Sequence, residues 1–314
     1  GISVWDYYFY SQDIDFLKST WGWVIANLKG AERLCTDRGL FSAPFWNMFD
    51  WSGIDDEHLT VLHNSMLLVG AINAAQKCAR ALGDDTQTQW LADFRERLRS
   101  SLNQFWYTDK SAYPDSLLED GAPSPSTSQH TSFLALLYDV IEPAHRQAAL
   151  ENILHPPEDM VRVGSPFAIL YLYEALEKEG LAEVILQSIY ASYLPMLEAG
   201  ATTVWEVFPS SAARPSSFPT RSHCHAWSAA PLYFLPRIIL GLRQIEPGGA
   251  VFELSPHLSG LEWAEGTVAT VHGPLHASWC KEGDILRIKV QVPPGISVHV
   301  VENESLKGLK ISSS

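Results

Sequence analysis

The chain has 314 residues, of which 46% are hydrophobic, and this length suits one large domain or two unequal ones. Its formal net charge of −14 argues against nucleic-acid and membrane-surface partners, because an acidic surface repels phosphates and anionic lipids. No run approaches the roughly 18 apolar residues that a membrane span requires. The four cysteines are too scattered for a zinc site or a disulfide framework, so we expect no metal, and nothing indicates a cofactor.

The sequence opens on GISVWDYY, with neither an initiator methionine nor a signal-peptide pattern. An aromatic helix is already under way at this point. We therefore expect that the start of a longer protein precedes the chain. Localisation, whether cytoplasmic or secreted, stays open, as does the oligomeric state.

The first two-thirds of the chain reads as helices joined by polar or proline-bearing loops. Apolar residues at Leu59, Leu62, Met66, Val69 and Ile72 recur every three or four positions, which is the helical period. Short connections favour antiparallel neighbours in hairpins, and no repeat of fixed period occurs, so we predict a toroid of helical hairpins with the active-site residues on loops at one rim. The predicted helices cover residues 13–28, 56–82, 87–106, 129–138, 143–154, 166–179, 181–197 and 225–242.

The pattern changes after Leu242. The segment GLRQIEPGG reads as a linker, and short β-rich runs follow it, among them VFELSP, TVATVHG, PLHASWC, ILRIKVQVP and ISVHVVEN. Alternation from Leu286 through Val292 has the two-residue period of a half-buried strand. We predict a mainly helical domain over residues 1–245 and a small antiparallel β-sandwich over residues 246–314.

Three loops hold the unusual residues. The segment SAPFWNMFDWSGIDDE contains Trp46, Asp50 and Trp51. GATTVWEVFP contains Trp205 and Glu206, and RSHCHAWSAAP contains His223, His225 and Trp227. Aromatic rings beside isolated carboxylates and a histidine suit carbohydrate chemistry, since indole faces stack on sugar rings and carboxyl groups bind hydroxyls or cleave acetals. These loops therefore predict a sugar-binding or sugar-cleaving site.

Structural alternatives exist for several of these residues. Asp50 also fits a turn whose side chain bonds the backbone, and a loop histidine such as His223 or His225 is often a structural hydrogen-bonding residue. The two histidines could suggest a metal, but no third ligand lies at a recognisable spacing. Glu206 is different, because burying an unpaired glutamate among Val, Trp and Phe costs several kcal/mol. It needs a partner or a function.

At these residues the sequence resembles the family-78 glycoside hydrolases, the α-L-rhamnosidases. The segment GATTVWEVFP matches the family's GATT-x-WE motif and is the most specific signal. FWNMFDWSG resembles its G-D-W loop, with Phe49 in place of the usual glycine. Four further segments support the resemblance: VWDYYFYSQDIDFLKSTW, SPFAILYLYEALEKEG, SHCHAWSAAPLYFL and GTVATVHGPLHASW.

The resemblance implies an (α/α)6 toroid followed by a C-terminal β-sandwich, and an inverting glycosidase acting on a rhamnose-containing oligosaccharide or glycoside. By this resemblance Glu206 is the general base that activates water. His225 lines the sugar pocket, with His223 as the second choice, and Asp50 and Trp51 belong to a pocket loop in which Trp51 stacks on the sugar. The resemblance also places Trp205 and Trp46 as nearby walls.

One motif of the family is missing. Its general acid lies upstream of the aromatic helix, in a motif of the kind D-x-x-x-R-D/E that does not occur in these 314 residues. About eight helices are visible where six hairpins need twelve, so we expect an incomplete toroid whose general acid lies on an absent upstream segment. Two alternatives stay open: another toroid carbohydrate enzyme, such as a glucoamylase-like hydrolase, a phosphorylase or a polysaccharide lyase, and a non-catalytic sugar-binding fragment.

Overall fold

Nine α-helices make up the first part of the chain in a computed structural model that describes residues 1–209 and 222–313. Most of them begin and end close to the predicted positions, because their apolar residues recur with helical period and face a common core. None of the described helices has the length and apolar character to cross a membrane. The helices are α1 (Ile2–Ser11), α2 (Ile14–Arg33), α3 (Leu62–Leu82), α4 (Thr88–Asn103), α5 (Gln129–Leu137), α6 (Arg146–Leu154), α7 (Pro166–Lys178), α8 (Ala182–Glu198) and α9 (Ala230–Ile238).

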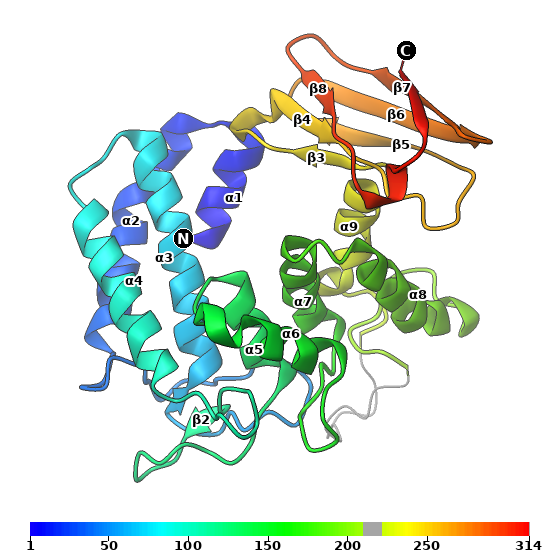
Figure 1. Cartoon of the computed structure of the whole chain (residues 1–314). Helices are drawn as coiled ribbons and strands as arrows, with labels where there is room; N and C mark the ends of the chain where they lie inside the picture. The colour runs from blue at the N-terminus through cyan, green and yellow to red at the C-terminus, as the bar shows by residue number, and fades with distance from the viewer. Residues whose placement is uncertain (210–221, 314) are drawn as a thin grey trace.

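The helices form hairpins arranged around a curve (Figure 1). Each odd-numbered helix from α1 to α7 contacts the helix that follows it, and the odd-numbered helices also contact one another in succession from α1 to α9. An inner row and an outer row result, which is the arrangement of a toroid of helical hairpins. The hairpin arrangement predicted from the sequence is therefore confirmed.

The described parts of the connections that follow α2, α4, α6 and α8 lie together at the lower end of the molecule in Figure 1, away from the β domain. These are the long connections, and they include all three loops that the sequence singled out. One of them carries β1 (Thr60–Val61), which pairs with β2 (Ser116–Leu117) in the next. The candidate site residues thus share one rim, because alternate ends of antiparallel hairpins meet on the same side.

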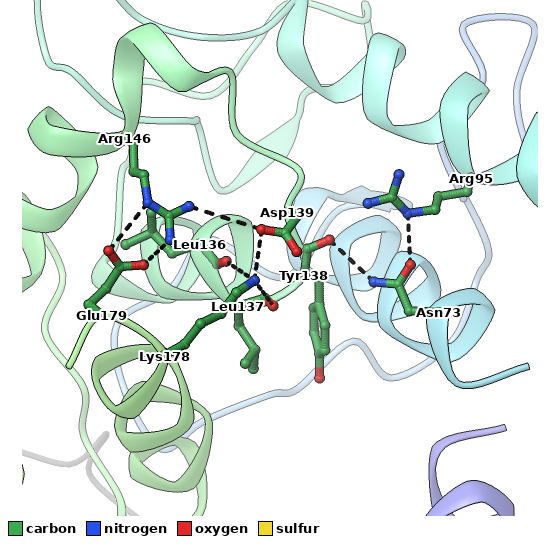
Figure 2. A network of polar contacts seen from close by, with 9 residues as sticks. All are labelled: Asn73, Arg95, Leu136, Leu137, Tyr138, Asp139, Arg146, Lys178 and Glu179. Carbon is green, nitrogen blue, oxygen red and sulfur yellow. Dashed lines mark hydrogen bonds and ion pairs between the residues drawn. The ribbon is translucent and has the colours of Figure 1, made fainter. Parts of the chain in front are cut away.

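The opposite ends of the hairpins are tied by a polar network (Figure 2). Lys178, the last residue of α7, donates to the carbonyl oxygens of Leu136 and Leu137 at 3.1 and 3.0 Å and lies 2.7 Å from Asp139. The last carbonyls of a helix have no partner within it, so the lysine satisfies those of α5. The network also includes Asn73, Arg95, Tyr138, Arg146 and Glu179.

A separate hydrophobic core lies in the β domain, which forms two sheets. One has the order β3-β4-β8 and the other β5-β6-β7-β9. The neighbours within β5-β6-β7 and the pair β3-β4 are antiparallel as predicted, whereas β8 and β9 join their sheets in parallel. The strands are β3 (Leu242–Gln244), β4 (Val251–Leu254), β5 (Trp263–Thr270), β6 (Gly273–Glu282), β7 (Ile285–Gln291), β8 (Ser297–Val300) and β9 (Lys310–Ser313).

The boundaries of two predicted helices were wrong. α3 begins at Leu62 and not at residue 56, because Thr60 and Val61 pair with β2. The last helix was predicted over residues 225–242, but α9 begins only at Ala230, after a 3-10 turn over Ala226–Ser228. It ends at Ile238, after the internal Pro236, and the predicted linker contains β3. Leu242–Gln244 therefore belongs to a β-sheet, although the sequence analysis assigned it to the helical domain.

Candidate active site

Glu206 lies in the connection between α8 and α9. Its backbone N–H donates to the carbonyl of Ser222 at 2.9 Å, and the N–H of His225 donates to Val204 at 3.0 Å, so the segment around Glu206 runs beside residues 222–225. The two halves of the connection fix each other through these backbone bonds. They place Glu206 and His225 on the same side of the rim.

Both carboxylate oxygens of Glu206 accept hydrogen bonds. The indole Nε1 of Trp51 donates to Oε1 at 3.0 Å, and the backbone N–H of Ser222 donates to Oε2 at 3.1 Å. The Nδ1 of His225 lies 3.8 Å from Oε2, and only 13% of the Glu206 side chain is exposed. The carboxylate is thus desolvated but partnered, which offsets the cost of its burial.

Further aromatic rings lie close to Glu206 along the chain and in space. The His225 ring lies 4.3 Å from Trp227, whose Nε1 donates to the Glu206 carbonyl at 3.1 Å. Trp205 stacks on the exposed His223 at 4.4 Å with an interplanar angle of 18°. The structure therefore brings His225 to the glutamate, while His223 is a neighbour of Trp205.

Asp50 is buried, although the sequence predicted it to be part of a pocket loop that contacts the sugar. Its side chain has no exposed surface, and Oδ2 lies 2.7 Å from Nε2 of His130 at the start of α5. The backbone N–H of Gly164 donates to the same oxygen, also at 2.7 Å. Trp51, the next residue, has its indole at Glu206. In this structure Asp50 therefore supports the loop from beneath.

Trp46 lies on the same loop but is 81% exposed. Its neighbour Asn47 is buried and donates to the carbonyl of His58 at 2.8 Å. Phe45 is also exposed, at 63%. Trp46 therefore presents an aromatic face to solvent at the rim and is not packed beside Glu206.

Sequence reasoning missed three residues that hold this site: His130, Gly164 and Ser222. His130 had a recognisable signal, because the QHTS run opens a helix in which residues 129–136 are all buried, and polar residues in such a helix require partners. The donors from Gly164 and Ser222 are backbone N–H groups, which carry no sequence signal.

His63 on α3 is a second buried histidine under the loop. Burial and the nearby His130 lower its pKa to about 3, against the effect of its hydrogen bond to the Asn47 carbonyl. Its ring stacks on Phe49 with centroids 5.1 Å apart. His63 is therefore a neutral support for the loop. Among the described residues, no group of three His, Cys, Asp or Glu side chains could hold a metal ion.

Family models match almost the whole chain. Residues 1–239 match the bacterial alpha-L-rhamnosidase six-hairpin glycosidase domain, and residues 241–310 match the bacterial alpha-L-rhamnosidase C-terminal domain. A GH78 family rhamnosidase of Bacillus sp. GL1 has a similar structure, with a TM-score of 0.94, 32% identity and coverage of all of this chain and 33% of that one.

More distant relatives support the same fold. The Streptomyces avermitilis α-L-rhamnosidase complexed with L-rhamnose has a TM-score of 0.73 at 21% identity, over 95% of this chain and 28% of that one. An α-L-rhamnosidase of Alteromonas sp. (strain LOR) is 28% identical over 185 residues, which are 55% of this chain and 20% of that protein. One from Formosa agariphila is 22% identical over 214 residues, 64% of this chain and 23% of that protein. The chain thus spans a third or less of the length of these relatives.

Proposed function

This chain belongs to the bacterial α-L-rhamnosidase six-hairpin glycosidase family, and we propose that it supplies the general-base side of an active site that hydrolyses terminal α-L-rhamnosides with inversion. The observation that carries the proposal is the largely buried Glu206 carboxylate, held by N–H donors on both oxygens beside His225. Because the chain spans only part of its relatives, the activity is proposed for the longer enzyme that contains it.

In this mechanism Glu206 accepts a proton from a water molecule whose oxygen attacks the anomeric carbon. A carboxylic acid outside the present chain protonates the glycosidic oxygen, and the bond to the aglycone breaks. Inverting enzymes hold the two carboxyl groups about 6.5–9.5 Å apart, which leaves room for the water. The donors from Trp51 and Ser222 fix the plane of the Glu206 carboxylate, and a fixed base of this kind avoids reorganisation during the reaction.

The sugar is proposed to lie over the rim between His225 and the indoles. His225 is half-buried and contacts Glu206 and Trp227, so its ring is oriented to bond a sugar hydroxyl. The half-buried Trp51 and Trp205 offer aromatic surface beside Glu206, and Trp46 and His223 on the same loops are exposed to solvent. An L-rhamnose complex of a distant relative agrees with a rhamnoside substrate.

The test is Glu206→Gln in the full-length enzyme, assayed with p-nitrophenyl α-L-rhamnoside. Glutamine keeps the size of the side chain and one oxygen acceptor but cannot take a proton, so kcat should fall by about 10²- to 10⁴-fold. The variant should stay folded with a modestly lower melting temperature, because its NH₂ group faces one of the two N–H donors. The matched control is Glu198→Gln, an exposed glutamate at the end of α8, which should keep full activity. Near-normal turnover by Glu206→Gln contradicts the assignment.

Assays of the same full-length protein on other substrates test the two alternative functions. Release of nitrophenol from an α-L-rhamnoside and not from α-glucosides distinguishes a rhamnosidase from a glucoamylase-like hydrolase. A polysaccharide lyase cleaves by elimination and not by hydrolysis. Formation of an unsaturated uronate from a uronate-containing polysaccharide would therefore indicate a lyase. Calorimetric binding of rhamnose with no turnover by the full-length protein would indicate a sugar-binding function.

A further inference from the structure

We infer that His130 is a positioning residue for the reaction: through buried Asp50 it fixes Trp51, and so the hydrogen bond that Trp51 donates to Glu206. The inference rests on the proposed function of Glu206 as the base. His130 itself lies beneath the rim and has no exposed surface, so it is not in contact with the sugar. Its effect has to pass through the loop.

The first link is the clamp on Asp50. Oδ2 of Asp50 lies 2.7 Å from Nε2 of His130 and accepts a hydrogen bond of 2.7 Å from the backbone N–H of Gly164. These groups come from α5 and from the connection before α7. Two separate parts of the chain therefore hold the loop between α2 and α3 in place. Side chains of both His130 and Asp50 are fully buried, and a short hydrogen bond in such a water-excluded place holds its geometry tightly.

The second link is the close approach of Gly164 to the loop backbone. A Cβ atom built on Gly164 would lie 2.2 Å from the carbonyl oxygen of Trp51 and 2.9 Å from Cβ of Ser52. Only a glycine fits here, because any side chain would displace the loop. The backbone on both sides of Trp51 is therefore fixed, by Asp50 before it and by the contact with Gly164 at its own carbonyl.

The third link is the indole of Trp51. With its backbone held, its Nε1 reaches Oε1 of Glu206 at 3.0 Å, and the other oxygen is held by Ser222. A shift of Trp51 removes the donor that fixes the carboxylate plane. Misplacement of a catalytic group by about 1 Å can cost on the order of 10²-fold in rate, so a residue beneath the rim can act on kcat.

A purely structural role for the His130–Asp50 pair makes a different prediction. Removing one partner of a buried polar pair lowers stability whatever the loop above it does. Stability alone therefore does not test the inference. The informative quantities are the separation of kcat from KM, rescue by a side chain that restores the donor, and coupling to Trp51.

The experiment uses the full-length enzyme with p-nitrophenyl α-L-rhamnoside and compares His130→Asn with His130→Gln. Both are small amides, but only the Gln amide extends as far as Nε2 of histidine and can donate to Asp50. We expect His130→Asn to lower kcat about 10- to 100-fold with KM changed less than about threefold, and His130→Gln to stay within about threefold of wild type.

The coupling is measured with Trp51→Phe, which keeps the ring and removes the N–H donor. If His130 acts through Trp51, His130→Asn should lower kcat little further in the Trp51→Phe background, because the donor is already lost. Asn152→Leu is the control for loss of a buried polar contact elsewhere. Asn152 is 7% exposed and donates to the Ser111 carbonyl at 2.7 Å, and its variant should lose stability but keep kcat.

Several results overturn the inference. Equal kcat values for His130→Asn and His130→Gln, or independent multiplicative losses with Trp51→Phe, mean that the pair is structural only. If Glu206→Gln is inactive while both His130 variants keep kcat, the base assignment stands and the inference fails. If Glu206→Gln is fully active, the base assignment fails and the inference falls with it.

Discussion

The indole nitrogen of Trp51 donates a 3.0 Å hydrogen bond to Oε1 of Glu206, although 155 positions of the chain separate the two residues. Each comes from a different connection at the rim, one before α3 and one before α9. The bond indicates a second role for Trp51, for which the sequence had suggested only stacking on the sugar. Its ring and its N–H make separate contributions that substitution can separate.

The first prediction concerns these two contributions. Trp51→Phe retains most of the ring and loses the donor to Glu206, so kcat of the full-length enzyme should fall about tenfold or more with little change in KM. Trp51→Ala also removes the aromatic surface, so KM for the rhamnoside should rise as well. Steady-state kinetics on both variants checks this. Identical kinetics for the two variants would assign the whole effect of Trp51 to the N–H donor and none to its ring.

The second prediction concerns stability in acid. Burial lowers the pKa of His63 to about 3, so the folded chain keeps this ring neutral while the unfolded chain protonates it below about pH 6.5. Stability from His63 is therefore present above pH 6.5 and is lost as pH falls toward 3, by up to about 4 kcal/mol. His63→Gln should flatten this acid loss.

Urea unfolding at several pH values between 7 and 4 measures it. Gln can still donate toward the Asn47 carbonyl, so a modest loss at pH 7 and a smaller slope below pH 6.5 are expected. His155→Gln, on a side chain that is 75% exposed, should leave the slope unchanged. Parallel curves for wild type and His63→Gln would contradict the prediction.

The third prediction concerns a group whose contribution to stability is lost as the pH rises, the opposite direction to that of His63. Burial, with Asp6 and Glu177 nearby, raises the pKa of Glu174 on α7 to about 7, against the opposing effects of Arg237 and Lys77. Between about pH 4.5 and 7 the folded chain holds a proton that the unfolded chain has released. Stability from this group is therefore present below pH 4.5 and is lost as pH rises through 7.

Glu174→Gln removes that loss. The variant should be more stable than wild type at pH 8 by roughly 2 kcal/mol and should differ little at pH 4.5. Thermal or urea unfolding at the two pH values measures the difference, with the exposed Glu198→Gln as the control. A gain of the same size at both pH values would mean that packing, and not titration, causes the effect.

The fourth prediction concerns the connection between the two domains. Gly241 has a φ of 74°, and a Cβ atom on it would lie 2.2 Å from the backbone nitrogen of Pro256. Gly241→Ala should destabilise the chain by at least about 2 kcal/mol, since the backbone conformation and the contact both exclude a side chain.

Gly22 is the matched control, because it lies inside α2 and a Cβ atom there would meet nothing within 4 Å. Gly22→Ala should stabilise the chain by about 0.5–1 kcal/mol, as alanine does at open helical positions. Melting temperatures that move in opposite directions for the two variants confirm the pair of predictions. A tolerated Gly241→Ala contradicts the first.

Much of the secondary structure could be predicted from the sequence, because hydrophobic periodicity and the residues that end helices and strands are local properties. The helix predicted to end at residue 82 ends at Leu82, with Gly83 in the left-handed conformation after it, and Leu286 and Ile288 are buried on β7 as their alternation indicated. Where prediction failed, distant pairing was the reason. Thr60 and Val61 continue a helical pattern but pair with a strand some 55 residues later in the chain.

The candidate site divides in the same way. Sequence alone singled out Glu206, because a carboxylate in an apolar run requires a partner, and the family motif then suggested its role. It could not identify His130 as the partner of Asp50, since 80 positions separate them, nor the donors from Gly164 and Ser222, which are backbone groups.

By itself, then, the sequence determined the helices, most of the strands and the loops that hold the unusual residues, because periodicity and turn residues act over a few positions. Only the tertiary structure decided that Asp50 lies beneath the rim while Trp51 reaches Glu206. The physical reason is that burial and hydrogen-bond partners are set by how separate hairpins come together, and each hairpin's own residues leave that open.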